Sequence, residues 1–219
     1  MILNKYEKAL FYEIFNNKEY SIVDKIICDC KIVFDIGSHI GFFSLYGFKN
    51  NPELKIHCFE ACKENYQKSK FILKDYEEKI ILNNLFADYE DKEKKMHINT
   101  EKNMQSSFYN NQFLCKSDKK ETVKTVNLMK YIKEQNLDYK NSIDLTKIDI
   151  EGYEFELLLN VEGNFFNCVK TLIYEYHILF PDFEIKYETL LTKLKCYYKK
   201  IKIIKSKYND KVGIIVCEN

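Results

Sequence analysis

Residues 33–44 read Val-Phe-Asp-Ile-Gly-Ser-His-Ile-Gly-Phe-Phe-Ser, and this stretch is the best guide to the fold. An apolar run ends in Asp35, Gly37 follows, and Gly41 precedes an apolar helical pattern. This order is typical of a buried parallel strand, a tight turn and the start of a helix. Such a βα unit is the part of an α/β sheet on which nucleotide-type cofactors bind.

The spacing of the two glycines narrows the choice of cofactor. A dinucleotide site needs Gly-x-Gly-x-x-Gly, so that backbone without side chains can touch the pyrophosphate. Here His39 and Phe42 stand at the second and third glycine positions, which argues against a nucleotide-dependent oxidoreductase. The pattern Asp-x-Gly-x-x-x-Gly suits a ligand with an ammonium and a carboxylate group and no phosphate. S-adenosylmethionine is such a ligand.

A second predicted strand, residues 54–60, also ends in an acid. Glu60 follows Asp35 by 25 residues and closes the mostly apolar run Leu-Lys-Ile-His-Cys-Phe. An acid at the tip of the second strand is where a ribose diol is bound, because one carboxylate can accept hydrogen bonds from both hydroxyls. We therefore expect Glu60 to bind the ribose of the cofactor.

Length and composition favour one compact domain with little attraction for nucleic acid. The chain has 219 residues and a net charge of +1, and all of its 34 basic residues are lysines. Phosphate-driven binding of nucleic acid is therefore not expected. We expect an N-terminal helical cap over residues 1–30, folded near the cofactor or at a subunit contact, and the main domain over residues 31–219.

Strands and helices alternate along the main domain. Apolar runs at 31–36, 54–60, 79–86, 143–150 and 169–176 are separated by helical patterns or loops, which predicts an α/β doubly wound, mostly parallel sheet. Residues 199–204 and 211–216 flank Tyr-Asn-Asp and read as an antiparallel C-terminal hairpin. The long connection 88–126 is the least regular part, and it either lines the acceptor pocket or forms a surface excursion.

Four segments together resemble the FkbM family of class I S-adenosylmethionine-dependent methyltransferases. They are residues 33–44, 58–65 (Cys-Phe-Glu-Ala-Cys-Lys-Glu-Asn), 85–88 (Leu-Phe-Ala-Asp) and 145–154 (Leu-Thr-Lys-Ile-Asp-Ile-Glu-Gly-Tyr-Glu). The resemblance runs from about residue 31 to about 180. It implies a Rossmann-like, seven-stranded sheet of order 3-2-1-4-5-7-6. It also implies O-methylation of a sugar, a glycan precursor or another small metabolite.

The cofactor would lie beyond the carboxyl ends of the first three strands. Asp35 is expected to anchor the methionyl ammonium group, directly or through water, and Asp88 to lie near the adenine. The full set of expected cofactor-binding residues is Asp35, Gly37, Ser38, Gly41, Glu60, Ala61, Ala87 and Asp88.

The acceptor would lie beyond the fourth and fifth strands. The fourth supplies Lys147 and Asp149, directly after its apolar residues 143–145, and Glu175 and His177 alternate onto one face at the end of the fifth. Two routes for activating an acceptor hydroxyl remain open. His177 could act as a general base oriented by Glu175 or Asp149. Alternatively, Asp149 and Glu175 could hold Mg²⁺, as acids at these strand ends do in O-methyltransferases of the catechol type.

Other interpretations of the chain stay open. An N-methyltransferase of a small metabolite and a non-catalytic cofactor-binding scaffold are the alternatives to O-methylation. Scattered cysteines and the lack of a signal-peptide pattern favour a cytoplasmic protein, with a role in polysaccharide biosynthesis and a homodimer both conceivable. Tyr153 and Tyr176 are the aromatic candidates for the pocket, whereas His57 and His97 are expected at the surface.

Overall fold

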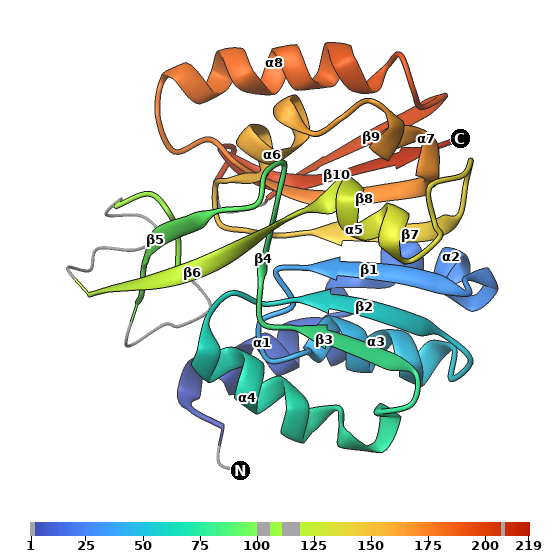
Figure 1. Ribbon diagram of the computed structural model, residues 1–219, viewed down its shortest axis with the longest axis vertical. Helices are drawn as coiled ribbons and strands as arrows, with labels where there is room; N and C mark the ends of the chain where they lie inside the picture. The colour runs from blue at the N-terminus through green and yellow to red at the C-terminus, as the bar shows by residue number, and fades with distance from the viewer. Residues whose placement is uncertain (1–2, 100–105, 111–118, 207–208) are drawn as a thin grey trace.

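The protein is built on a seven-stranded sheet with helices on both faces (Figure 1). The computed structural model describes residues 3–99, 106–110, 119–206 and 209–219. The strand order is β3-β2-β1-β7-β8-β10-β9, and every neighbouring pair is parallel except the two that involve β10. Counting only strands of this sheet, the order is 3-2-1-4-5-7-6, which confirms the predicted doubly wound fold with an antiparallel C-terminal hairpin.

The bounds of the strands agree with the predicted runs to within a few residues, with one exception described below. The strands of the main sheet are β1 (Ile32–Ile36), β2 (Lys55–Phe59), β3 (Ile80–Asn83), β7 (Ile143–Ile148), β8 (Val169–His177), β9 (Lys200–Lys205) and β10 (Val212–Glu218). The helices are α1 (Lys5–Phe15), α2 (Asp24–Asp29), α3 (Phe42–Asn50), α4 (Lys63–Ile72), α5 (Leu128–Glu134), α6 (Glu154–Asn160), α7 (Asn164–Cys168) and α8 (Asp182–Leu194), with 3₁₀ turns η1 (Glu19–Val23) and η2 (Lys74–Tyr76). Within the described residues, no helix combines the length and the hydrophobicity that a bilayer crossing requires.

The central strands are apolar on both faces, as a sheet covered by helices requires. In β1, Val33 packs in a core with α1, α2 and α3, whereas Phe34 and Ile36 pack in the opposite core with α5, α6 and α8. Asp35 falls on the same face as Val33 and is fully buried there. A carboxylate in this position needs polar partners, and the site described below supplies them.

A second, three-stranded sheet corrects two expectations. The predicted strand 79–86 is divided into β3 and β4 (Phe86–Asp88), and β4 pairs with β6 (Lys120–Asn127) and not with the main sheet. β6 also pairs with β5 (Glu93–His97), so the order is β4-β6-β5, and this sheet projects from one end of the molecule (Figure 1). The connection 88–126 is therefore largely regular at its two ends. Residues 100–105 and 111–118 of that connection, with Cys115, lie outside the described residues.

The predicted N-terminal cap packs into the same core as β1 and α3. Asn4 and Glu7 form a reciprocal capping box that starts α1. The Phe11 and Phe15 rings of α1 contact Phe42 at the start of α3, with centroids 5.3 and 6.3 Å apart. α1 is thereby held against the helix that follows the glycine turn.

The expectation that His57 and His97 lie at the surface is wrong, because both are buried. His57 is stacked on Phe34, and its Nδ1 lies 2.9 Å from the hydroxyl of Tyr131. Burial, with a smaller contribution from the charge on Lys55, lowers the pKa of His57 to about 4. The imidazole therefore packs as a neutral ring in the core between β2 and α5.

The burial of His57 predicts that this one residue causes part of the protein's loss of stability at low pH. The pKa of His57 is lower in the folded protein than its ordinary value of 6.5, so its contribution to stability is complete above pH 6.5 and is lost as the pH falls toward 4. We expect the wild type to lose about 2 kcal/mol more stability than His57→Leu between pH 7 and pH 5. Urea denaturation of both proteins across this range measures the difference. Parallel pH profiles would contradict the assignment.

Candidate active site

A cavity of about 610 Å³ lies beyond the carboxyl ends of the parallel strands. Its size is within the range of small-molecule sites in proteins. Segments that follow β1, β2, β7 and β8 all contribute to its wall, as expected for an open α/β sheet. The predicted site residues that line it are Gly37, Ser38, Glu60, Ala61, Ala87, Lys147, Asp149, Glu175 and His177.

The glycine turn after β1 is shaped by its contact with the end of β7. Gly37 has a φ of +75°, and a Cβ atom there would lie 1.8 Å from the carbonyl oxygen of Asp149. Gly41 has a φ of +88°, and a Cβ atom there would lie 2.5 Å from the Leu73 side chain. Both positions therefore need glycine because the protein's own chain approaches them closely.

Asp35 does not line the cavity. It is fully buried behind the turn, where its Oδ2 accepts a hydrogen bond of 2.7 Å from the hydroxyl of Ser44. Its Oδ1 lies 3.5 Å from the Nζ of Lys147. Burial raises the pKa of Asp35, although Lys147 and Ser44 both oppose this shift. The direct contact with a cofactor ammonium group that the sequence allowed is not available to this side chain.

Lys147 joins the ends of β1 and β7. Its Nζ donates a hydrogen bond of 2.8 Å to the carbonyl of Gly37 and lies 3.6 Å from Oδ2 of Asp149. Burial lowers the pKa of Lys147, but Asp149 and Asp35 outweigh this effect and raise it overall. The lysine is therefore a buried cation that connects the two acids and the glycine turn.

Glu60 lies at the tip of β2, as predicted. Its Oε2 accepts a hydrogen bond of 2.9 Å from the amide of His39, and its Oε1 accepts one of 2.8 Å from the amide of Cys62. Burial raises the pKa of Glu60 to about 7, although these bonds favour the charged form. The two amides hold the carboxylate at the cavity wall.

Asp149, Glu175 and His177 meet at the ends of β7 and β8. One potential ligand atom from each residue lies within 4.8 Å of the others. The Oδ1 of Asp149 is buried and has no hydrogen-bond partner among the described residues. Burial and the charge on Asp149 raise the pKa of Glu175 to about 8. Two carboxylates and an imidazole are thus gathered at the ends of these two strands.

His177 is oriented by Glu154, which corrects the expectation that Glu175 or Asp149 would do so. Its Nδ1 lies 3.2 Å from Oε1 of Glu154, while its Nε2 lies 3.6 Å from Glu151 and 3.9 Å from Glu175. Burial lowers the pKa of His177, but Glu154, Glu175 and Glu151 outweigh it and raise the pKa well above its ordinary value. The surrounding carboxylates therefore favour the positively charged imidazolium form of His177.

Glu154 is fully buried and also organises the loop after β7. Its carboxylate accepts hydrogen bonds from the amides of Ile150 and Gly152, at 2.9 and 3.0 Å. Glu151 adopts a φ of +53° in this loop, which is uncommon for a residue with a side chain. Residues 151–154 belong to one of the segments that carry the family resemblance, but only the contacts identify the partners of Glu154.

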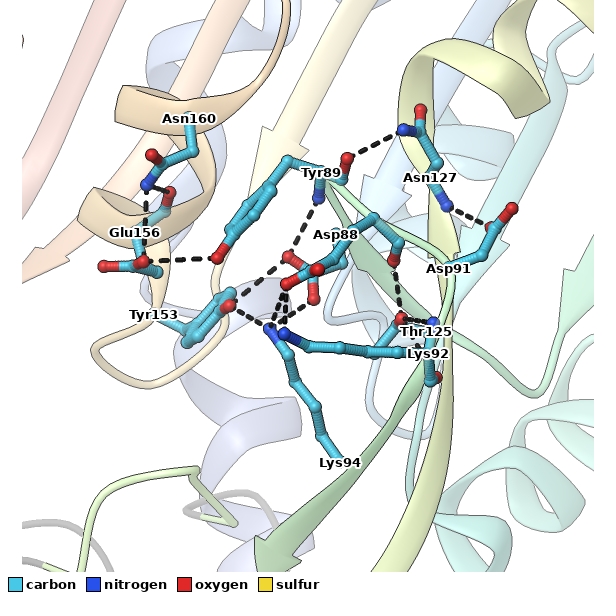
Figure 2. Close-up of polar contacts among 11 residues, drawn as sticks. Asp88, Tyr89, Asp91, Lys92, Lys94, Thr125, Asn127, Tyr153, Glu156 and Asn160 are labelled. Atoms are coloured by element: carbon cyan, nitrogen blue, oxygen red, sulfur yellow. Dashed lines mark hydrogen bonds and ion pairs between the residues drawn. The ribbon is translucent and has the colours of Figure 1, made fainter.

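Asp88 and Tyr153 form a separate buried network (Figure 2). Lys94 forms an ion pair with Asp88 and hydrogen bonds to the hydroxyl of Tyr153, and the amide of Tyr89 donates to Asp88 at 2.8 Å. Neither Asp88 nor Tyr153 lines the cavity, and Tyr176 is buried elsewhere in the core. The expected roles of the two tyrosines in the pocket are therefore not supported. Asp88 is engaged in joining β5 to α6.

Comparison with family models gave one match that covers most of the chain. A model described as the methyltransferase FkbM domain matches residues 35–197. A comparison with curated protein sequences found no significant match.

Solved structures with a similar fold include several methyltransferases. Methyltransferase FkbM from Methylobacillus flagellatus KT has a TM-score of 0.57 and 13% identity, over 87% of this chain and 44% of that one. The chain thus spans less than half the length of that protein. The METTL16 methyltransferase domain has a TM-score of 0.57 and 10% identity, over 100% and 70% of the two chains. An S-adenosylmethionine-dependent O-methyltransferase from Thermotoga maritima has a TM-score of 0.53 and 11% identity, over 94% and 69%. At these identities the likeness concerns the fold alone.

The Lys94–Asp88 pair yields a prediction about stability. Lys94→Met leaves the fully buried carboxylate of Asp88 without its cation, which should cost about 3 kcal/mol of unfolding free energy. The exposed Lys95→Met on the same strand is the matched control and should change stability by less than about 0.5 kcal/mol.

Adding Asp88→Asn to Lys94→Met removes the unpaired charge and should restore part of the loss. Chemical denaturation of the four proteins provides the comparison. If the double variant is no more stable than Lys94→Met, the cost comes from lost packing of the lysine over the Tyr153 ring, 4.5 Å away, and not from the charge.

Proposed function

This chain belongs to the FkbM methyltransferase domain family, and from that premise we propose that it transfers a methyl group from S-adenosylmethionine to a hydroxyl group. The acceptor class we propose is a sugar, a glycan precursor or another small metabolite. The observation that carries the proposal is the cavity in which Glu60, the glycine turn and the Asp149–Glu175–His177 cluster meet.

The residues around the cavity fit S-adenosylmethionine. Glu60 would hold the ribose hydroxyls, because two backbone amides fix its carboxylate while lone pairs remain for a ligand. Ser38 Oγ and Asp149 Oδ1 are buried polar atoms without a hydrogen-bond partner among the described residues, and both residues line the cavity. Buried polar atoms normally have hydrogen-bond partners, and a ligand bound in the cavity would supply them here.

Asp35 would act on the cofactor through Lys147 and not by contact. Its carboxylate keeps the Lys147 ammonium group at the Gly37 carbonyl, and this arrangement supports the turn that would face the methionyl group. Asp149, on the other side of Lys147, is the acid that reaches the cavity. It is therefore our candidate for the ammonium contact first expected of Asp35.

Methyl transfer to a hydroxyl requires removal of a proton from the acceptor. The cofactor supplies a methyl group on a sulfonium, and the acceptor oxygen must lose its proton as it attacks. His177 can accept that proton at Nε2 only when it is neutral, whereas Glu154, Glu175 and Glu151 favour its charged form. A positive charge bound among these acids would lower the pKa of His177 and release its proton.

Mg²⁺ is the alternative means of activation. Asp149 and Glu175 offer hard oxygen ligands, and the nearby His177 completes a cluster within 4.8 Å. Crowded carboxylates with a raised pKa, such as Glu175, are consistent with a site that receives a cation. A metal held there would lower the pKa of the acceptor hydroxyl.

The first test of the proposal is cofactor binding. We expect calorimetry to detect binding of S-adenosylmethionine or its demethylated product, and Glu60→Ala to weaken both about tenfold because a charged hydrogen-bond acceptor for the ribose is lost. Binding of NADH with no binding of S-adenosylmethionine would overturn the assignment.

A second test separates the two routes of activation. Methyl transfer to an acceptor is measured with and without EDTA, and in His177→Ala. If His177 is the base, we expect a loss of about 100-fold or more in His177→Ala and full activity in EDTA. If Mg²⁺ is required, EDTA should abolish transfer and added Mg²⁺ should restore it. Full activity of His177→Ala in EDTA would remove both routes.

A further inference from the structure

The N-terminal helical segment forms part of the cavity wall. Leu10, Glu13 and Ile14 lie on one face of α1, at spacings of three and four residues, and all three line the cavity. Glu19 and Tyr20 of η1 line it as well. This wall brings two carboxylates from outside the methyltransferase sheet to the cavity that contains Asp149 and Glu175.

The segment is held firmly in this position. The Lys68 ammonium group of α4 lies 2.8 Å from the buried Glu7 carboxylate of α1. The Tyr20 ring packs edge-on against Phe43 of α3, with centroids 4.8 Å apart. The helical segment is therefore packed against α3 and α4, and the face that carries Glu13 and Glu19 forms part of the cavity wall.

The positive charges of the cavity wall do not balance these acids. Among the described residues, neither Glu13 nor Glu19 takes part in an ion pair. Lys147 is shared between Asp35 and Asp149, and His177 is surrounded by three other carboxylates. The remaining lysine of the wall, Lys211, is exposed at the end of the C-terminal hairpin.

The pKa of Glu19 is raised to about 7. Burial is the main cause, the charges on Glu13 and Asp149 contribute to the increase, and the charge on Lys147 opposes it. A cation that enters the cavity would relieve the repulsion between these acids. A neutral ligand of the same shape would not.

We propose that Glu13 and Glu19 make the cavity selective for the positively charged sulfonium of S-adenosylmethionine over the neutral thioether of the product. This inference rests on the proposed function, since it concerns the same site. The two ligands share the adenosine and the amino acid groups and differ by one methyl group and its charge. Acids that act through charge alone must therefore favour the substrate form and ease release of the product.

Calorimetric titration of S-adenosylmethionine and S-adenosylhomocysteine tests the proposal. The quantity compared is the ratio of their two dissociation constants, product over substrate, in the wild type, Glu13→Gln and Glu19→Gln. Glutamine keeps the shape and removes the charge, and neither glutamate forms an ion pair within the described part of the chain, so the variants should fold. We expect the ratio to fall about fivefold in Glu19→Gln, with a smaller decrease in Glu13→Gln.

Two controls distinguish charge selectivity from a general loss of binding. Glu184→Gln, on the exposed face of α8, should leave the ratio unchanged. Added salt should lower the wild-type ratio and have less effect on that of Glu19→Gln.

The titrations distinguish a failure of the charge selectivity from a failure of the proposed function. A ratio in Glu19→Gln equal to that of the wild type overturns the charge selectivity and leaves the proposed function intact. Equal weakening of both ligands also overturns it, because Glu19 would then be a general binding residue. If the wild type binds neither ligand, the proposed function itself fails and the inference fails with it.

Discussion

The ion pairs of Lys147 are the interaction on which the geometry of the site depends. This buried ammonium group lies between Asp35 on β1 and Asp149 after β7, and it donates to the carbonyl of Gly37. A buried cation needs such partners, and the fully buried carboxylate of Asp35 needs such a cation. Beside these ion pairs, the end of β7 lies so close to the turn that only glycine fits at position 37. The contacts that hold β1 and β7 together at this point therefore also shape the wall of the cavity.

An excess of carboxylates characterises the cavity as a whole. Burial, as the main cause, raises the pKa of Glu19 and Glu60 to about 7 and that of Glu175 to about 8. These acids come from the N-terminal segment, from β2 and from β8, so no single motif accounts for them. A cavity of this kind has a free-energy preference for positively charged ligands. The proposed cofactor, with its sulfonium and ammonium groups, has that character.

The second sheet supports the side of the cavity that contains His177. β5 is joined to the start of α6 through Lys94, Asp88 and Tyr153 (Figure 2). α6 begins at Glu154, which orients His177. Ser107 also donates a hydrogen bond to the carbonyl of Glu151, at 2.6 Å. The long connection between β4 and β6 is thus tied at two points to the loop that carries the acid cluster.

The sequence by itself determined the doubly wound sheet, the position of the glycine turn and the acids at the strand ends. Those features follow from local patterns, because an apolar run, a glycine and an acid occupy adjacent positions in the chain. The tertiary structure alone decided which acids reach the cavity. Asp35 and Asp88 have the spacing of ligand contacts, yet their partners Lys147 and Lys94 turn them inward. Glu19 gained its surroundings, and Glu154 its contact with His177, only through contacts between distant segments, and such electrostatic environments depend on distances that no local pattern encodes.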